Sequence, residues 1–177
     1  AYGWYNADVT VSFAASDALS GLDTVTPPVT VSEEGKGLSV TGTAVDLAGN
    51  SASATLSGIN LDKTRPTLVG VLDPQPNAHG WNNTDVTVHW QAEDALSGVD
   101  PAAMPADQRI TGEGTDLQAG PVSVSDRAGN TATASVKGVR IDRTPPVVTL
   151  GEPYPEPNDA GWYRVDVSVP FSATDAL

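Results

Sequence analysis

Oxygen-bearing side chains recur in the turns of this chain, and they are the residues with the most readily assigned chemistry. The stretch DALSG begins at Asp17 and again at Asp94, and the stretch DxAGN begins at Asp46 and again at Asp126. Carboxylate and amide oxygens are the ligands that hard cations such as Ca²⁺ take in proteins. The same residue types also cap tight turns without any ligand, and turn capping alone accounts for these loops. Both interpretations stay open from the sequence.

Catalytic chemistry has little support in the sequence. Acid–base or nucleophilic catalysis needs several tuned groups in one pocket, and the chain has 2 His and no Cys. His89 stands between Val88 and Trp90 in an alternating stretch, so we expect it to face solvent, and His79 lies in a proline-rich loop. The sequence therefore predicts a protein that is not an enzyme and has no cofactor apart from the candidate Ca²⁺.

The charge balance bears on the partners that the chain could have. With 22 acidic and 9 basic residues the net charge is −13, whereas nucleic-acid phosphates require clustered Lys and Arg. The sequence also has no stretch of about 18 apolar residues, which a membrane-spanning helix needs. We therefore expect neither nucleic-acid binding nor membrane insertion.

A long internal repeat organises the sequence. GWYNADVTVSFAASDALSG from Gly3 aligns without gaps with GWNNTDVTVHWQAEDALSG from Gly80 and with GWYRVDVSVPFSATDAL from Gly161. The period of about 80 residues is that of a small domain rather than a solenoid repeat. We predict a first copy at 1–64 that lacks its first strand, a complete second copy at 65–144, and a third copy at 145–177 that contains only the first two strands.

The partial copies predict that the chain is a slice of a longer array, with neighbouring domains of the same chain as its first partners. The third copy is too short for a core of its own, so we expect it to be disordered unless something covers it. The cover is either the rest of that domain or the first copy of a neighbouring chain, as in a filament. The former is favoured, because residues 1–19 already contain the corresponding second strand.

Apolar residues alternate with polar ones in several short segments, which is typical of strands with one buried face. Asp and Gly at DLAGN and DRAGN favour tight hairpin turns. Short strands with Pro and Gly turns predict an all-β, antiparallel sandwich, with a parallel contact only where a first strand meets a last one. The expected inward residues are Phe13, Val88 and Trp90, and the expected outward residues are Thr10, Ser12 and Thr87.

Three tryptophans begin the aligned segments: Trp4, Trp81 and Trp162. They could form a platform on which sugars stack, or they could close one end of the sandwich. Each has a preceding Gly and stands at the same place in its copy, so packing is the favoured interpretation.

The pattern GWYxxDVxVxFxAxDALSG followed by VTGTAxDxAGNxASAxxSGIxxDKTxP resembles the tandem immunoglobulin-like repeats of large bacterial surface and secreted proteins. The resemblance implies tandem immunoglobulin-like antiparallel β-sandwiches, in which DALSG and DRAGN lie at the same end as the incoming linker. That geometry would gather five oxygen-bearing side chains into a Ca²⁺ site at a domain junction. The five are Asp62, Asp94, Asp100, Asp126 and Asn130.

The resemblance also implies a structural role. We expect a spacer or stalk in an extracellular, cell-surface or filament protein that presents distal adhesive or catalytic domains. The linkers NLDKTRP and RIDRTPP contain Pro, which restricts the backbone and favours semi-rigid connections. The alternatives are a carbohydrate- or protein-binding module and accessory domains of a secreted enzyme.

Overall fold

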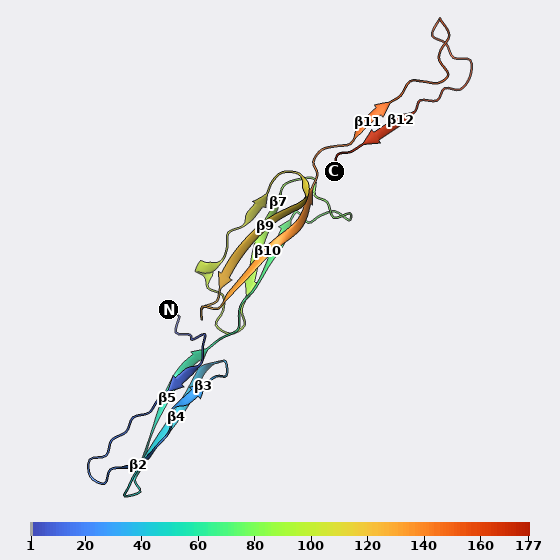
Figure 1. Ribbon diagram of the computed structural model, residues 1–177. Coiled ribbons are helices and arrows are strands. Elements are labelled where there is room, and N and C mark those ends of the chain that lie inside the picture. Colours follow the sequence, from blue (N-terminus) through green and yellow to red (C-terminus); the bar gives the residue numbers. More distant parts are fainter. Residues whose placement is uncertain (1) are drawn as a thin grey trace. The chain divides into compact units, whose positions relative to one another are not determined.

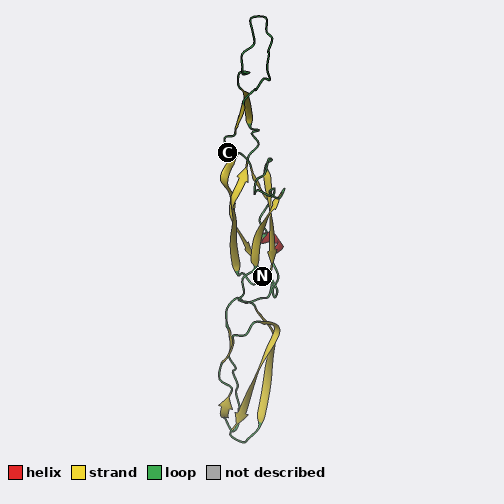
Figure 2. Ribbon diagram, turned by 90° about the vertical axis from the view of Figure 1, so that its right-hand side faces the viewer, coloured by secondary structure: helices red, strands yellow, loops and turns green. Residues whose placement is uncertain are grey.

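The computed structural model describes residues 2–177, and these form an almost entirely β structure (Figure 1). Its one helical element is the single 3₁₀ turn η1 (Figure 2). None of the described residues lies in a helix with the length and apolar character needed to cross a bilayer. The elements are β1 (Val9–Val11), β2 (Leu22–Val25), β3 (Val29–Val31), β4 (Gly35–Asp46), β5 (Ser51–Leu61), β6 (Thr67–Asp73), β7 (Val86–Glu93), η1 (Pro101–Ala103), β8 (Gln108–Ile110), β9 (Gly114–Ser125), β10 (Thr131–Ile141), β11 (Val147–Leu150) and β12 (Phe171–Thr174).

The chain divides into two compact units. The first unit runs to Val71 and also contains Val88–Gln108 and Ala119–Val136. The second unit contains Leu72–Thr87, Arg109–Gln118 and Lys137–Leu177. The predicted domain boundaries at residues 64 and 144 stay a prediction.

The strands form small sheets with antiparallel ladders. The sheet orders are β1-β3, β2-β4-β5, β6-β7-β8, β9-β10 and β11-β12. The registers of β1 with β3 and of β4 with β2 and β5 are antiparallel, which confirms the predicted sheet type. Parallel bridges join Tyr5 to Leu61 and Asn82 to Ile141. The parallel contacts therefore involve residues just before β1 and β7, whereas the sequence predicted them between the first and the last strand of a copy. The arrangement is compatible with β-sandwiches, whereas the immunoglobulin-like assignment stays a prediction.

The strand phase predicted for the second copy is confirmed. In β7 the side chains of Val86, Val88 and Trp90 are buried, and the residues between them are half-buried. Trp90 is only 5% exposed, as the alternation of apolar and polar residues requires. Thr87 was expected outside and is half-buried. His89 is also half-buried, and its Nδ1 lies 2.7 Å from Oδ2 of Asp107.

The first copy has a small core of its own. Val11, Val40 and Ile59 are buried, and Phe13 is half-buried against them, whereas Thr10 and Ser12 are exposed as predicted. Gly42 makes room for the Phe13 ring, because an ideal Cβ at Gly42 would lie 2.4 Å from that ring. Glycine at this place in β4 is therefore a packing requirement.

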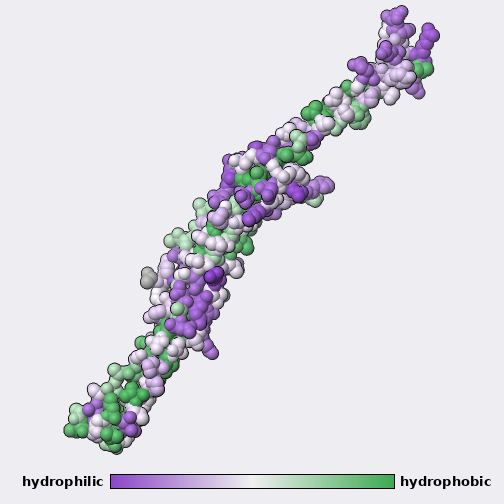
Figure 3. Space-filling model, viewed as in Figure 1, coloured by the Kyte–Doolittle hydropathy of each residue, from purple (hydrophilic) through white to green (hydrophobic). Residues whose placement is uncertain are grey.

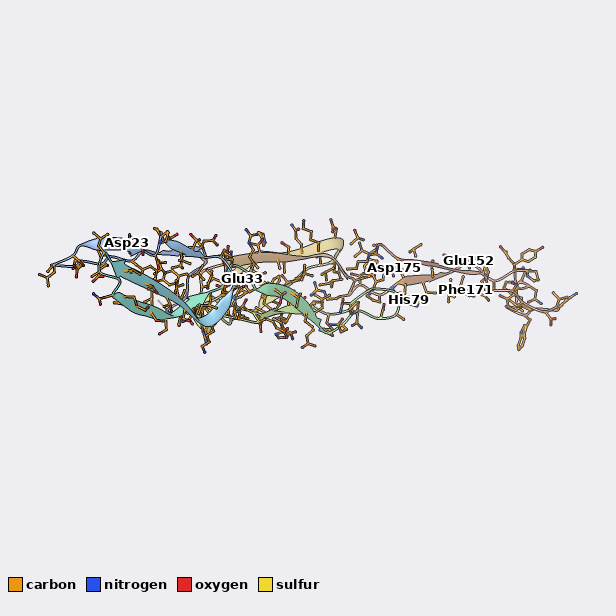
Figure 4. All side chains as sticks on the ribbon, turned by 90° about the horizontal axis from the view of Figure 1, so that it is seen from below. Asp23, Glu33, His79, Glu152, Phe171 and Asp175 are labelled. Carbon is orange, nitrogen blue, oxygen red and sulfur yellow. The ribbon has the colours of Figure 1, made fainter. Side chains whose placement is uncertain are left out.

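The third copy forms a ribbon of two strands, in which Val147 pairs with Thr174 and Leu150 pairs with Phe171. The prediction that it lacks a core is confirmed, since none of its described residues is buried. The prediction of disorder is wrong, because β11 and β12 pair although all their side chains are exposed, including Phe171 (Figure 4). The prediction that the third tryptophan is packed is also wrong. Trp162 is 74% exposed, because the two-stranded ribbon has no second sheet among the described residues to cover it.

The other two tryptophans are half-buried, which agrees with the packing interpretation. The guanidinium of Arg140 lies 5.8 Å from the centre of the Trp81 ring. At that distance the cation is attracted to the electron-rich face of the indole ring.

Candidate metal centre

Three carboxylates converge within the first unit, each positioned by the end of a strand. Asp62 follows β5, Asp94 follows β7, and Asp126 follows β9. One carboxylate oxygen from each lies within 4.8 Å of the others. Asp62 and Asp126 are buried, with exposures of 0% and 2%, and Asp94 is half-buried. We call Asp62, Asp94 and Asp126 the acidic triad.

The DALSG turn holds the carboxylate of Asp94. Its Oδ1 accepts hydrogen bonds from the backbone N–H groups of Leu96 and Gly98, at 3.2 and 2.6 Å. Gly98 has φ of 79°, a left-handed conformation that glycine adopts without strain. No donor among the described residues bonds to Oδ2 of Asp94, so this oxygen is available to a cation.

The DRAGN turn holds Asp126 in a similar way. Its Oδ1 accepts from the N–H groups of Gly129 and Asn130, at 2.7 and 2.8 Å. The side-chain Nδ2 of Asn130 donates to Oδ2 of Asp126 at 2.8 Å and to the backbone carbonyl of Asp62 at 2.9 Å. Asn130 therefore fastens two members of the triad through its amide nitrogen and acts as a positioning residue rather than as an oxygen ligand.

Asp62 connects the linker to both of these turns. Its Oδ2 accepts from the N–H of Ser97 at 2.9 Å, and its Oδ1 accepts from the N–H of Thr64 at 3.1 Å. Ser97 is 4% exposed, so its bond to Asp62 lies away from solvent. Residue spacing did not indicate this contact, because the donor is a backbone group that any residue at position 97 would supply.

Asp100 is the predicted ligand that the structure does not place in the triad. Its Oδ1 accepts from the N–H of Ala102 at 3.0 Å, which caps η1, and from the hydroxyl of Tyr2 at 2.9 Å. The hydrogen bond from Tyr2 to Asp100 raises the pKa of the tyrosine above its usual value. The carboxylate of Asp100 therefore caps a turn and accepts a hydrogen bond from an exposed tyrosine, although Asp100 is only six residues from Asp94 in the sequence.

Basic side chains do not neutralise the triad. Lys63 and Arg127 are the closest in sequence, yet Nζ of Lys63 binds Asp8 at 2.8 Å and the Arg127 guanidinium lies 5.6 Å from the Tyr2 ring centre. Among the described residues, no Lys, Arg or His forms an ion pair with a triad carboxylate. Three carboxylates with oxygen-only chemistry and no cationic partner form a group that could hold a hard divalent cation.

The first copy contains two of the three corresponding residues in the same local geometry. Oδ1 of Asp17 accepts from the N–H groups of Leu19 and Gly21 at 3.1 and 2.8 Å, as Asp94 does in its turn. Asp46 accepts from the N–H and Nδ2 of Asn50, both at 2.8 Å, as Asp126 does from Asn130. The two turns therefore form independently of a third carboxylate.

These hydrogen bonds predict a pH dependence for the first copy. The pKa of Asp17 is lowered mainly by the N–H of Gly21, and the pKa of Asp46 is lowered mainly by the side chain of Asn50. A lowered pKa in the folded state adds stability above the unfolded value, about 3.9 for Asp, and that stability is lost as the pH falls through the folded value. We expect the double variant Asp17→Asn, Asp46→Asn to show a weaker loss of stability below about pH 4.

The measurement is denaturant unfolding followed by circular dichroism at a series of acidic pH values. Asp23→Asn is the matched control, since among the described residues its carboxylate accepts no hydrogen bond. If the double variant lost stability on the acid side as steeply as the parent, the two turns would contribute nothing to the pH dependence.

Comparison of the chain with protein-family models, with curated proteins and with solved structures gives no match. The metal-binding potential of the triad therefore stands on its geometry alone.

Proposed function

We propose that this chain is a non-enzymatic spacer array of a bacterial extracellular, cell-surface or filament protein, built from immunoglobulin-like copies and stiffened by Ca²⁺. The all-β architecture and the repetition of one sequence unit support this role. An array of this kind holds a distal adhesive or catalytic domain away from its point of attachment.

The observation that carries the proposal is the set of hydrogen bonds made by the linker between β5 and β6. Asp62 is bonded through its carboxylate to Ser97 and through its carbonyl to Asn130. Four residues after Asp62 comes Pro66, which fixes its own backbone angle and restricts Arg65. Oγ1 of Thr67 then donates to the carbonyl of Glu93 at 3.2 Å. A linker held at both ends transmits orientation, which a spacer requires and a flexible tether does not provide.

Electrostatics indicates why a cation belongs at the triad. Two ionised carboxylate oxygens at 4.8 Å repel each other by about 3 kcal/mol at an effective dielectric constant of about 20. Three such pairs oppose the folded linker, whereas the N–H groups that bond to these carboxylates act in the opposite direction. A Ca²⁺ ion bound by Asp62, Asp94 and Asp126, with water completing its shell, turns this repulsion into attraction. Ion binding would then stiffen the linker.

Small-angle scattering of the intact chain, with Ca²⁺ and with a chelator, tests the proposal. We expect an extended particle in both conditions, and a narrower distribution of long distances with Ca²⁺. Asp62→Asn should abolish the Ca²⁺-dependent change, because the amide removes one charge while keeping the shape of the side chain. A closely packed globule in both conditions would overturn the spacer role.

A further inference from the structure

The linker that follows β5 is held from two sides. Asp62 is bound by the second copy, since its Oδ2 accepts from the N–H of Ser97 at 2.9 Å. The next two residues, Lys63 and Thr64, are bound instead by Glu34 of the first copy. Hydrophilic residues surround this part of the first unit (Figure 3). Consecutive linker residues are therefore fastened to different copies.

Glu34 lies just before β4 and binds the linker with both oxygens of its carboxylate. Its Oε1 accepts from the N–H of Lys63, and the hydroxyl of Thr64 donates to Oε1 and Oε2 at 3.1 and 2.9 Å. Nζ of Lys63 adds a second attachment to the first copy, at 2.8 Å from Oδ1 of Asp8 and 2.6 Å from the carbonyl of Ser32. Hydrogen bonds to an ionised carboxylate are stronger than neutral ones. We call the contacts of Glu34 with Lys63 and Thr64 the Glu34 clamp.

The Glu34 clamp reaches Asp62 through Thr64. The N–H of Thr64 donates to Oδ1 of Asp62 at 3.1 Å, so Glu34 fixes the residue whose N–H orients this carboxylate. Asp62 is buried, whereas Glu34 and Thr64 lie on the surface. A short path of hydrogen bonds therefore leads from the surface of the first copy to a buried member of the acidic triad.

The same contacts recur at the linker that follows β10. Glu113 accepts from the N–H of Arg143 at 2.7 Å and from the hydroxyl of Thr144 at 3.0 Å. The N–H of Thr144 donates to Oδ1 of Asp142 at 3.0 Å, and Arg143 pairs with Asp85 at 2.8 Å. The contacts recur although the basic residue is Lys in one linker and Arg in the other, so they are a property of the repeat.

We propose that Glu34 of the first copy is a positioning residue for the cation site of the second copy, and that it couples the two copies. The inference rests on the proposed binding of Ca²⁺ at the acidic triad. With the Glu34 clamp formed, Asp62 is already oriented, so a cation does not have to order the linker when it binds. Coupling is reciprocal, so cation binding strengthens the attachment of the linker to the first copy by the same factor. An ion bound in the second copy therefore stabilises the copy before it.

Calorimetric titration of intact chains with CaCl₂ tests the proposal. Glu34→Ala should raise the dissociation constant at least about fivefold, the lower end of the usual coupling between two sites. Glu113→Ala is the reference variant, because it removes the same contacts from Arg143 and Thr144 at the linker after β10. It should leave the dissociation constant unchanged, since these contacts do not reach the acidic triad.

Two further variants separate positioning from charge. Glu33→Ala removes the neighbouring carboxylate, which accepts no hydrogen bond among the described residues, so it reports the loss of charge alone. Glu34→Gln keeps Oε1 as an acceptor for Lys63 and Thr64 and should retain most of the parent's Ca²⁺ affinity. If Glu33→Ala weakens binding as much as Glu34→Ala, or if Glu34→Gln is as weak as Glu34→Ala, the effect is electrostatic and the positioning role is overturned.

Hydrogen exchange in the presence of a chelator tests the coupling without the cation. Ser97 is buried and its N–H donates to Asp62, so the exchange rate of this N–H reports whether Asp62 is held in place. Glu34→Ala should accelerate the exchange at least about fivefold, and Glu113→Ala should not. This acceleration in a parent that takes up no Ca²⁺ would exclude the proposed cation and support the coupling. An unchanged exchange rate, or an unchanged dissociation constant where the parent binds Ca²⁺, would overturn the coupling.

Discussion

Replacing Trp90 with alanine is expected to lower the free energy of unfolding by about 3 to 5 kcal/mol, the range for a large buried side chain. Trp90 is 5% exposed in β7, and its ring lies near Gly70 of β6. Removing the ring leaves a cavity that the surrounding backbone cannot fill. A loss of this size approaches the whole stability of a small domain, which is typically about 5 to 15 kcal/mol. Denaturant unfolding followed by circular dichroism measures it.

Two further variants make the Trp90 result specific. Trp162→Ala is the control, because Trp162 is 74% exposed and its removal should change stability by less than about 0.5 kcal/mol. Trp90→Phe should cost much less than Trp90→Ala, since Nε1 of Trp90 is buried without a hydrogen-bond partner among the described residues. Equal effects of the Trp90→Ala and Trp162→Ala variants would contradict the position of Trp90 in the core.

Adding Ca²⁺ is expected to raise the melting temperature, because an ion that binds only the folded chain stabilises it by mass action. At a concentration one hundred times the dissociation constant the gain is about 2.7 kcal/mol. Asp126→Asn should abolish the shift, since it removes one of three converging charges and keeps the hydrogen bonds that an amide oxygen can accept. Differential scanning calorimetry with Ca²⁺ and with a chelator measures both effects.

The structure supplies a matched control for the Ca²⁺ experiment. Asp100 is also a loop aspartate near the triad in sequence, but its carboxylate binds Tyr2 and Ala102. Asp100→Asn should therefore keep the full Ca²⁺ shift. In chelator, Asp126→Asn relieves the mutual repulsion of the triad but loses the oxygen that accepts from Nδ2 of Asn130, so the response to Ca²⁺, and not the stability in chelator, is the quantity compared. The absence of both heat and thermal shift at millimolar Ca²⁺ would exclude a Ca²⁺ site at the triad.

The sequence by itself determined the strand phase in the second copy. Apolar and polar residues alternate in Val86, Val88 and Trp90, and only one face of a pleated strand can then be buried. The turns were equally predictable, because Gly49 and Gly129 adopt the positive φ that DxAGN requires. These are local properties, decided by residues that are neighbours in the chain.

Membership of the acidic triad was decided by tertiary structure. The repeat indicated which loops have carboxylates, but Asp100 and Asp94 are close in sequence and take different partners. Asn130 was expected as an oxygen ligand and instead donates from its amide nitrogen to Asp62 and Asp126. Side-chain direction depends on the path of three strand ends that are distant in sequence, and no local pattern encodes that path.

The length of the strand at residues 9–16 is likewise a tertiary feature. Its sequence, VTVSFAAS, has the alternation of its counterpart VTVHWQAE, yet only the counterpart is a strand throughout. The same holds for Trp162, which follows a glycine as Trp81 does but is 74% exposed, whereas Trp81 is half-buried. A strand of this kind is stabilised by hydrogen bonds and side chains from its neighbours, so segments with similar alternation take different states beside different neighbours.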